Sequence, residues 1–370
     1  MQFALPDDLV AFRDLARDFA QKHIAPFARK WDAEKWLPDE TIKKMGEAGL
    51  LGVTIPEEYG GAGQGLLAMT VVVEEIARHC GATALMIAAH SGLCTNHIKL
   101  AGNDAQKRKY LPQLADAKIV GAWCLSEPHC GTDAAAMTTR AEKDGSGWVI
   151  NGQKMWITNG KRAGVYVVIA RTSSQPGARA FSAFIVERGA KGLEVGEPED
   201  KMGMRASDTV PLSFENVRVG EDALCGKLGD GYVDALRVLD RGRVTIASLS
   251  LGLGRGCLEE AVKYAADRKA FGKPLHANQA IQIKLADMET QVEAARILVR
   301  QAASTAKLFA SEMASRVGWD SIQIHGGAGY TKDICVERLV RDNKLCEIGE
   351  GSSEVQRMLI ARAEFQKRSA

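Results

Sequence analysis

The sequence predicts a mainly helical α+β chain with a helical N-terminal domain, a central antiparallel β-domain and a C-terminal helical bundle. Three observations predict this order. Apolar residues recur every three or four positions over residues 1–118, alternate with other residues over 119–225, and return to the helical period over 226–370. Because helices, strands and helices follow one another in blocks, the pattern argues against a doubly wound α/β sheet, in which strands and helices alternate.

The N-terminal unit shows amphipathic helices separated by a glycine-rich break. The apolar positions that indicate helices are Leu9, Phe12, Leu15 and Phe19, and later Val72, Val73, Ile76 and Cys80. The break lies at residues 55–63, where Pro56 is followed by Gly60, Gly61 and Gly63. No comparably long strand pattern interrupts this segment.

The middle unit shows β-strand patterns joined by turns. Val165, Val167 and Ile169 alternate with their neighbours, and residues 181–186 form a second β-prone run. The glycine-containing turn at 144–147 precedes a third strand candidate at Trp148. We therefore expect a small antiparallel β-domain.

The C-terminal unit returns to the helical period at Leu236, Leu239 and Val244 and continues through a long apolar stretch at 279–313. The glycines at 252–256 superficially resemble a dinucleotide-binding loop. They lack the Gly-x-Gly-x-x-Gly spacing and follow a helix instead of a strand, so we expect them to permit close helix packing.

Composition excludes several classes of protein. The net charge is +2, from 48 basic and 46 acidic residues, and the basic residues form no stripe interleaved with aromatics, so we expect no nucleic-acid partner. No apolar run reaches the roughly 18 residues of a membrane span, and no signal-peptide core is present, so we expect a cytoplasmic protein. The eight cysteines contain no Cys-x-x-Cys pair and the seven histidines show no metal-ligand spacing, which predicts reduced thiols and no metal.

Glu350 is the first candidate for catalysis, because a carboxylate between Gly349 and Gly351 has a bare backbone that a large ligand can approach. A base held against a substrate would have this pattern. The same run, which continues with Ser352, Ser353 and Glu354, also reads as the charged N-terminus of a helix. The motifs in the rest of the chain favour the interpretation of Glu350 as a catalytic base.

Five further motifs, taken with the Glu350 segment, resemble the acyl-CoA dehydrogenase family over essentially the whole chain and in the same order. They lie at 123–133 (WCLSEPHCGTD), 154–160 (KMWITNG), 267–272 (DRKAFG), 323–330 (QIHGGAGY) and 338–342 (RLVRD). The resemblance implies the same three-domain fold, FAD as the cofactor, an acyl-CoA substrate, an electron-transfer flavoprotein as the electron acceptor, and a homotetramer.

The resemblance also assigns residues to the flavin. It places Leu125, Ser126, Gly131 and Thr132 along the ring and its ribityl chain, Trp156 and Thr158 at the ring, with the Thr158 hydroxyl reaching N5, and Ser352 and Glu354 near the cofactor. An indole face suits a flat, mostly apolar ring. Taken alone, Trp156 would be an ordinary strand aromatic and Ser126 and Thr132 would be turn residues.

A second set of matches reaches, in the family, the FAD of a neighbouring subunit. These residues are Arg268, Phe271, Gln323, Gly326 and Gly327. An arginine and bare glycine backbone suit a dinucleotide with two phosphates. The alternative is that Arg268 is a surface charge and the glycines form a loop.

For Glu350 the resemblance implies removal of the α-proton while hydride passes from the β-carbon to flavin N5, which gives a trans-2-enoyl-CoA. The thioester carbonyl would accept hydrogen bonds from the Glu350 amide and a ribityl hydroxyl, and desolvation should raise the pKa of Glu350. Some relatives carry the base at the position of Gly242, which cannot act as one. The residues assigned to the substrate are Ser126, Thr132, Asp240, Arg243, Gly349, Glu350 and Gly351; Asp240 and Arg243 could instead form a surface ion pair.

The departures from the family bear on the substrate. Many relatives have an aromatic residue where this chain has Gly349, so we expect a short, medium or branched acyl group from fatty acid β-oxidation or amino acid catabolism. Ala84 stands where the glutaryl branch has an arginine for a second carboxylate, which argues against a dicarboxylic substrate. At residues 300–307, relatives carry about a dozen additional residues that form the tip of a helical hairpin, so either the hairpin is truncated here or the sequence omits those residues.

Two other functions remain open from the sequence. The first is an acyl-CoA oxidase or another oxygen-using flavoenzyme of the same fold, which the production of hydrogen peroxide in air would reveal. The second is a non-catalytic helical scaffold, which would take up no FAD.

Overall fold

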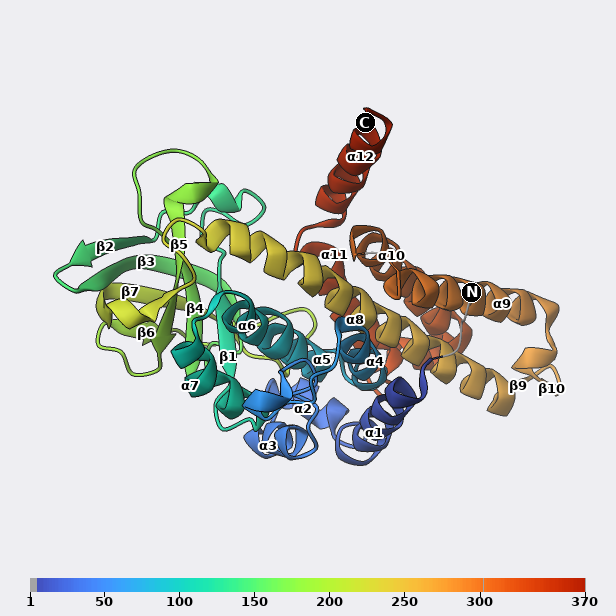
Figure 1. Cartoon of the computed structure of the whole chain (residues 1–370). Helices are drawn as coiled ribbons and strands as arrows, with labels where there is room; N and C mark the ends of the chain where they lie inside the picture. Colours follow the sequence, from blue (N-terminus) through green and yellow to red (C-terminus); the bar gives the residue numbers. More distant parts are fainter. Residues whose placement is uncertain (1–4, 302, 370) are drawn as a thin grey trace.

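A computed structural model describes residues 5–301 and 303–369. Helices form both ends of the chain, and the sheet domain that comes between them in the sequence lies at one side of the molecule (Figure 1). The N-terminal helices are α1 (Asp7–His23), α2 (Ala28–Glu34), α3 (Asp39–Glu47), α4 (Leu66–Ala77), α5 (Gly81–Ile87), the π-helical η2 (Ala88–Thr95), α6 (Asn96–Ala101) and α7 (Asp104–Ala115).

The N-terminal helices form where the apolar spacing predicts them. Leu9 and Phe19 of α1 are buried, and α4 buries all its residues from Ala68 to Ala77 because it lies between α1 and the long helix α8. The predicted break contains a short 3-10 turn, η1 (Glu57–Tyr59), which ends at Gly60 with φ +79°.

The central unit is one eight-stranded sheet. Its strands are β1 (Gly121–Cys124), β2 (Arg140–Asp144), β3 (Gly147–Thr158), β4 (Val165–Arg171), β5 (Phe181–Glu187), β6 (Leu193–Val195), β7 (Thr209–Gly220) and β8 (Leu224–Cys225). The order is β6-β7-β3-β2-β4-β5-β8, and β1 pairs with β4.

The sheet is mixed, whereas the sequence analysis predicts an antiparallel one. Most pairs are antiparallel, but β1 runs parallel to β4 from Gly121 to Cys124, and β2 meets β4 in parallel at Arg140. Local alternation shows that a segment is a strand but not which distant strand it joins, so the two parallel pairings leave no trace in the pattern. β4 is buried on both faces, because helices cover one side and the β3–β7 layer covers the other.

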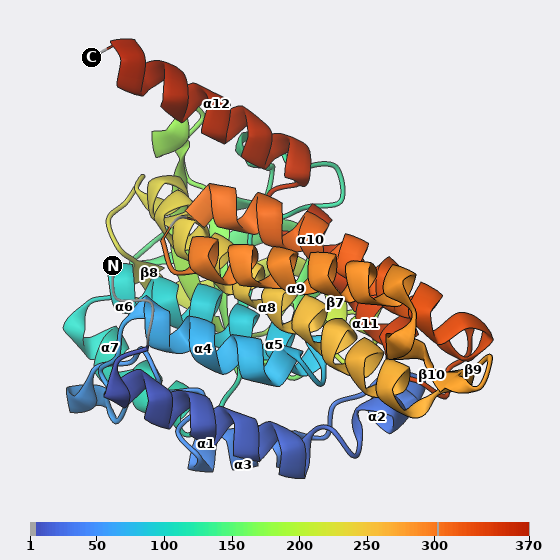
Figure 2. The same ribbon diagram turned by 90° about the vertical axis from the view of Figure 1, so that its right-hand side faces the viewer.

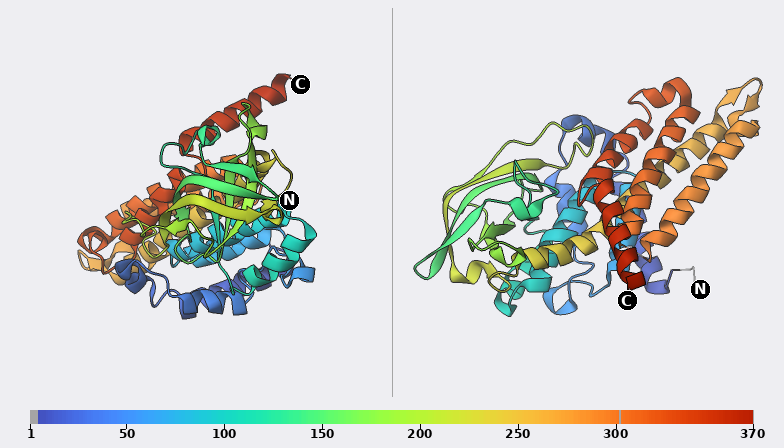
Figure 3. Two further views of the ribbon diagram at one scale, coloured as in Figure 1. Left: turned by 90° about the vertical axis from the view of Figure 1, so that its left-hand side faces the viewer. Right: turned by 90° about the horizontal axis from the view of Figure 1, so that it is seen from above.

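The C-terminal unit is a helical bundle built on one long helix (Figure 2). Its helices are α8 (Gly231–Asp267), α9 (Gln279–Val299), α10 (Ala303–His325), α11 (Val336–Ile348) and α12 (Ser353–Ser369), with a two-stranded hairpin of β9 (Lys269–Ala270) and β10 (Lys273–Pro274) between α8 and α9. The helix α12 projects away from the rest of the chain (Figures 1 and 3).

The glycines at 252–256 allow close helix packing, as predicted. A Cβ on Gly252 would lie 2.4 Å from the carbonyl oxygen of Glu74, and one on Gly256 would lie 2.4 Å from that of Arg78. Both distances are too short for any side chain, so these glycines let α8 pack directly against the backbone of the N-terminal helices.

The predicted reduced thiols are confirmed, since all eight cysteines are free. Within the described ranges 5–301 and 303–369, no helix combines the length and apolar character needed to cross a membrane. The helix α9 ends at Val299 and α10 begins at Ala303; the difference from relatives at this hairpin stays a prediction.

Candidate active site

Glu350 lies in the sharp turn between α11 and α12. Its φ is +54°, a left-handed value that is uncommon for a residue with a side chain, and Gly351 follows with φ +93°. The turn is held from two sides: the Lys307 ammonium donates to the carbonyl oxygen of Gly351 at 2.7 Å, and the Gln356 amide donates to the same oxygen at 3.1 Å. A strained backbone held in this way is typical of a functional position.

The Glu350 carboxylate lies over Gly242 of α8. A Cβ at Gly242 would be 2.1 Å from Glu350 Oε2 and 3.0 Å from Leu93 Cδ2, so only glycine at 242 leaves room for the carboxylate. Oε2 is buried and has no hydrogen-bond partner among the residues that the structure describes. Burial raises the pKa of Glu350 to about 7, against the opposing effects of Lys307 and Arg243.

Asp240 and Arg243 form the ion pair that the sequence analysis left open. Arg243 Nη1 donates to Asp240 Oδ1 at 2.7 Å, and the arginine side chain is mostly buried whereas the aspartate is exposed. Arg243 Nε is buried without a partner. The arginine therefore keeps a free donor on the side of the helix near Glu350.

The residues assigned to the flavin ring gather where the segment after β1 crosses β3. The Met155 amide donates to the carbonyl oxygen of Ser126 at 2.9 Å. A shift in strand register between Lys154 and Ile157 gives Trp156 a φ of +62° and leaves its indole 58% exposed. An indole turned outward on a rigid strand offers a flat apolar face to a ligand.

The other members of this group differ in burial. Leu125 is buried, Ser126 and Thr158 are half-buried, and Gly131 and Thr132 are exposed. The two residues at the start of α12 are also accessible: Ser352 is half-buried and Glu354 is exposed.

A buried ion pair that sequence reasoning missed fixes this group. Lys154 Nζ donates to Glu127 Oε1 at 2.9 Å and to the Leu125 carbonyl oxygen at 2.9 Å, so β3 is tied directly to the segment that carries the predicted flavin contacts. The backbone amides of Thr138 and Thr139 donate to the same carboxylate at 2.7 and 3.0 Å. A lysine directly before the apolar run Met155-Trp156-Ile157 of a strand is the sequence signal that could have revealed the pair.

Glu127 also belongs to a cluster with His129 and Cys130, whose possible metal-ligand atoms lie within 4.8 Å of one another. Both carboxylate oxygens of Glu127 already accept hydrogen bonds from Lys154 and the two threonines. The cluster is therefore explained by the ion pair, and the carboxylate serves as a structural anchor.

The second set of predicted cofactor residues lies at the other end of α8. Arg268, Gly326 and Gly327 line a shared cavity of about 420 Å³. Phe271 at the tip of the β9–β10 hairpin is fully exposed, and Gln323 is exposed on the last turn of α10. Arg268 lies about 39 Å along the helix from Gly242 at 1.5 Å per residue. Within one chain, the residues assigned to the flavin ring and those assigned to the FAD of a neighbouring subunit are therefore far apart.

The fold and this arrangement define a class of enzyme: an oxidoreductase with helical domains on either side of a sheet domain, a buried unpartnered carboxylate and an exposed indole. Three family models match the chain, those of the acyl-CoA dehydrogenase N-terminal domain (residues 6–118), middle domain (122–217) and C-terminal domain (229–365). The chain belongs to the acyl-CoA dehydrogenase family.

Relatives and solved structures agree with this assignment. The chain is 41% identical to the short-chain specific acyl-CoA dehydrogenase of Clostridium acetobutylicum, over 98% of this chain and 99% of that protein. It is similar to the butyryl-CoA dehydrogenase of Megasphaera elsdenii (TM-score 0.96, 38% identity, 99% and 100% of the two chains). A chain from a structure described as the electron transferring flavoprotein of Acidaminococcus fermentans matches with TM-score 0.97 and 41% identity, over 98% and 99% of the two chains.

Members of this family are FAD-dependent oxidoreductases that act on acyl-CoA, and the residues present fit the cofactor. The exposed Trp156 indole suits a flat ring. The cavity bordered by Arg268 and two glycines suits a diphosphate, because the guanidinium supplies charge and the glycines leave the backbone accessible. The predictions of the family, the fold, the cofactor and the enzyme class are confirmed.

Proposed function

We propose that this chain oxidises an acyl-CoA at its α,β carbon–carbon bond, with Glu350 as the base that takes the α-proton. The observation that carries the proposal is the buried Oε2 of Glu350, which has no hydrogen-bond partner and lies against Gly242. A carboxylate satisfied by donors would hold its charge too firmly to accept a proton. This one has a pKa of about 7 and is suited to proton transfer near neutral pH.

The turn around Glu350 supports the same role. Its left-handed backbone, tied to Lys307 through the carbonyl of Gly351, fixes the direction of the carboxylate. The main-chain amide of Glu350 is then available to polarise a thioester carbonyl, which stabilises the negative charge that develops when the α-proton leaves. The bound flavin would supply the two-electron acceptor that takes hydride from the β-carbon.

We further propose a short acyl chain and, as partners, other copies of this chain and an electron-transfer flavoprotein. A side chain at Gly349 would meet only Leu345, at 3.4 Å, so the glycine leaves space beside the base. The names of the short-chain and butyryl-CoA relatives agree with a small acyl group, and the Acidaminococcus match supports the electron acceptor. The roughly 39 Å between the two cofactor sets, with Met358 and Phe365 exposed on α12, supports a homotetramer that shares its FAD sites.

The proposal is tested with Glu350→Gln, which keeps the size of the side chain and removes the base. We expect the variant to retain FAD and bind butyryl-CoA, while anaerobic flavin reduction slows by about 10²- to 10⁴-fold. The matched control is Glu347→Gln, one turn earlier on α11, which should reduce normally. Reduction by Glu350→Gln at the wild-type rate would exclude Glu350 as the base. Hydrogen peroxide formed in air at the rate of substrate oxidation would favour an oxidase.

A further inference from the structure

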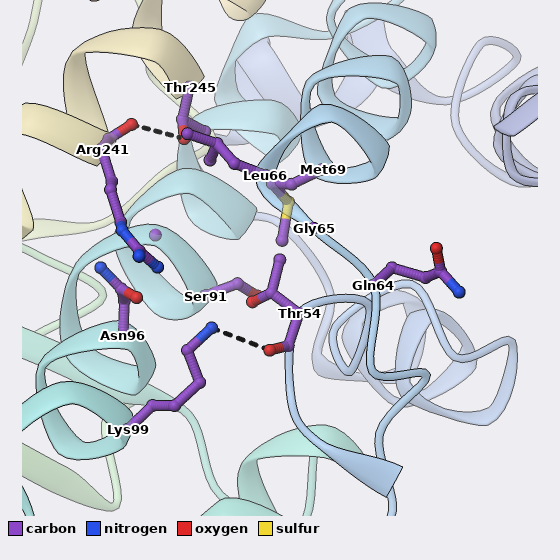
Figure 4. A pocket seen from close by; sticks show the side chains of 11 residues that line it. Thr54, Gln64, Gly65, Leu66, Met69, Ser91, Asn96, Lys99, Arg241 and Thr245 are labelled. Carbon is purple, nitrogen blue, oxygen red and sulfur yellow. Dashed lines mark hydrogen bonds between the residues drawn. The ribbon is translucent and has the colours of Figure 1, made fainter. Parts of the chain in front are cut away.

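A second, smaller cavity lies beside α8, where α4 and the η2–α6 helices meet it (Figure 4). Its volume is about 60 Å³. The side chains of Asn96, Lys99 and Arg241 converge on it from α6 and α8, while Leu66 and Met69 of α4 form an apolar wall. No residue assigned to FAD lines it.

The cavity carries two positive charges and no negative one. Lys99 and Arg241 both line it, and no carboxylate is among its lining residues. Lys99 Nζ donates to the carbonyl oxygen of Thr54 at 2.8 Å, which leaves two of its three N–H groups available. Within residues 5–301 and 303–369, no side-chain ion pair or hydrogen bond involves the Arg241 guanidinium.

The cations also disfavour each other. Burial and, to a smaller extent, the nearby charge of Arg241 together lower the pKa of Lys99 to about 8. Two like charges gathered in a small cavity are destabilising unless an anion lies between them. An anionic ligand would therefore relieve a cost that the free protein bears.

Asn96 gives an independent indication of a ligand. The side chain is only 5% exposed and lines the cavity, yet its Nδ2 is buried without a hydrogen-bond partner. Buried amide donors in proteins almost always have an acceptor. Asn96 Nδ2 therefore adds an unpartnered donor to the two cations, Lys99 and Arg241, that line the same cavity.

The cavity is adjacent to the Glu350 carboxylate. Arg241 and Thr245 flank Gly242 on α8, and a Cβ at Gly242 would contact Glu350 Oε2. Across from them, a Cβ on Gly92 would lie 3.5 Å from Thr245 Oγ1. The cavity therefore lies within a few residues of the base along α8, and its lining residue Gly92 places no side chain against Thr245.

We propose that this cavity binds the carboxylate at the far end of a short ω-carboxyacyl group, so that the preferred substrate is a dicarboxylic acyl-CoA. The inference rests on the proposed function and names the substrate class of the same active site. Ala84, where a related branch has its arginine, is fully buried in α5. Here the charges come from α6 and α8 instead, which revises the sequence-based expectation of a monocarboxylic acyl group.

The test compares two acyl-CoAs of equal length, adipyl-CoA and hexanoyl-CoA, which differ by a terminal carboxylate in place of a methyl group. The measured quantity is the ratio of kcat/KM for adipyl-CoA to that for hexanoyl-CoA. We expect Arg241→Met and Lys99→Met each to lower this ratio at least tenfold, and Arg241→Lys to restore most of it. Arg237→Met is the matched control, because Arg237 is an exposed residue of α8 paired with Asp234 outside the cavity.

The outcomes separate this inference from the proposed function. A ratio that changes less than twofold in both methionine variants, with hexanoyl-CoA still reducing the flavin, would overturn the inference and leave the proposed function standing. Failure of both acyl-CoAs to reduce the wild-type flavin would overturn both. Thermal unfolding of each purified holoenzyme shows whether a variant has folded.

Discussion

Two glutamates, Glu127 in the segment after β1 and Glu350 in the turn between α11 and α12, have opposite electrostatics. Glu127 accepts hydrogen bonds from Lys154 and from the amides of Thr138 and Thr139. Burial alone would raise its pKa, but these donors outweigh burial and lower it to about 2. Oε2 of Glu350 has no such partner, and burial raises its pKa to about 7. Burial therefore does not decide what a carboxylate does; the number of donors facing it does.

The largest expected effect is on stability, and it comes from replacing Glu127 by glutamine, the same substitution as Glu350→Gln. Glu127→Gln leaves the Lys154 ammonium buried without its counter-charge, which should destabilise the protein by about 3–5 kcal/mol. Urea unfolding of the holoenzyme near neutral pH measures the loss. Glu350→Gln removes a carboxylate that has no partner for its buried oxygen, so we expect no loss of stability there.

A double variant provides the control. Glu127→Gln combined with Lys154→Met removes both charges and should recover part of the stability, because no unpaired ion remains buried. If Glu127→Gln and Glu350→Gln proved equally stable, the distinction between an anchoring and a reactive carboxylate would be wrong.

The two carboxylates should also respond oppositely to pH. The pKa of Glu127 is lowered from 4.5 to about 2 on folding, so its contribution to stability is complete above pH 4.5 and is lost as the pH falls through about 2. The pKa of Glu350 is raised from 4.5 to about 7, so its ionisation costs stability as the pH rises from 4.5 to about 7.

A smaller effect is expected at Trp156, which lies two residues after the lysine of the buried ion pair. Trp156→Ala removes the exposed indole without disturbing Lys154, so the fold should persist while FAD binds more weakly. Stacking of an aromatic side chain on a flat base contributes about 1–3 kcal/mol, which corresponds to roughly a tenfold or greater loss of affinity. Flavin content after dialysis measures it, and Trp319→Ala, at another exposed tryptophan, is the control. Equal flavin retention in both variants would remove Trp156 from the flavin site.

The smallest effect is expected at Lys307, whose charge acts on Glu350 without contacting the carboxylate. Lys307→Met removes a charge that lowers the pKa of Glu350, so the midpoint of the pH dependence of kcat/KM should move upward. Lys344→Met, an exposed lysine paired with Glu347, should leave the midpoint in place. A midpoint that stays fixed or moves downward in Lys307→Met would show that the charge does not act on the base.

Much of the fold could be predicted from the sequence because local periodicity determines it. The α1 and α4 spacing, the β3–β5 runs and the glycines at 252–256 all lie where the patterns indicate. The parallel pairing of β1 with β4 could not be read from the sequence, since it depends on contact between segments some forty residues apart.

The residues of the candidate site also fall into those that the sequence could predict and those that it could not. Glu350 stands out by its flanking glycines, and the resemblance implies that Gly242 leaves an alternative base position empty. The contact between the Glu350 carboxylate and Gly242 is seen only in the structure. The contribution of Lys99, Arg241 and Asn96 could not be predicted, because each is unremarkable in its own helix and they meet only through the packing of α6 against α8. The same holds for Lys307, which reaches the Glu350 turn from α10.

The most direct test is the ionisation of Glu350 itself in the ligand-free holoenzyme. Infrared difference spectra between wild type and Glu350→Gln, recorded from pH 5 to 9, isolate the carboxyl stretch of this one side chain. The desolvated, unpartnered environment of Oε2 predicts a protonated carboxyl band that disappears with a midpoint near pH 7. A carboxylate already ionised at pH 5 would contradict the account, because it would place Glu350 in the same class as Glu127.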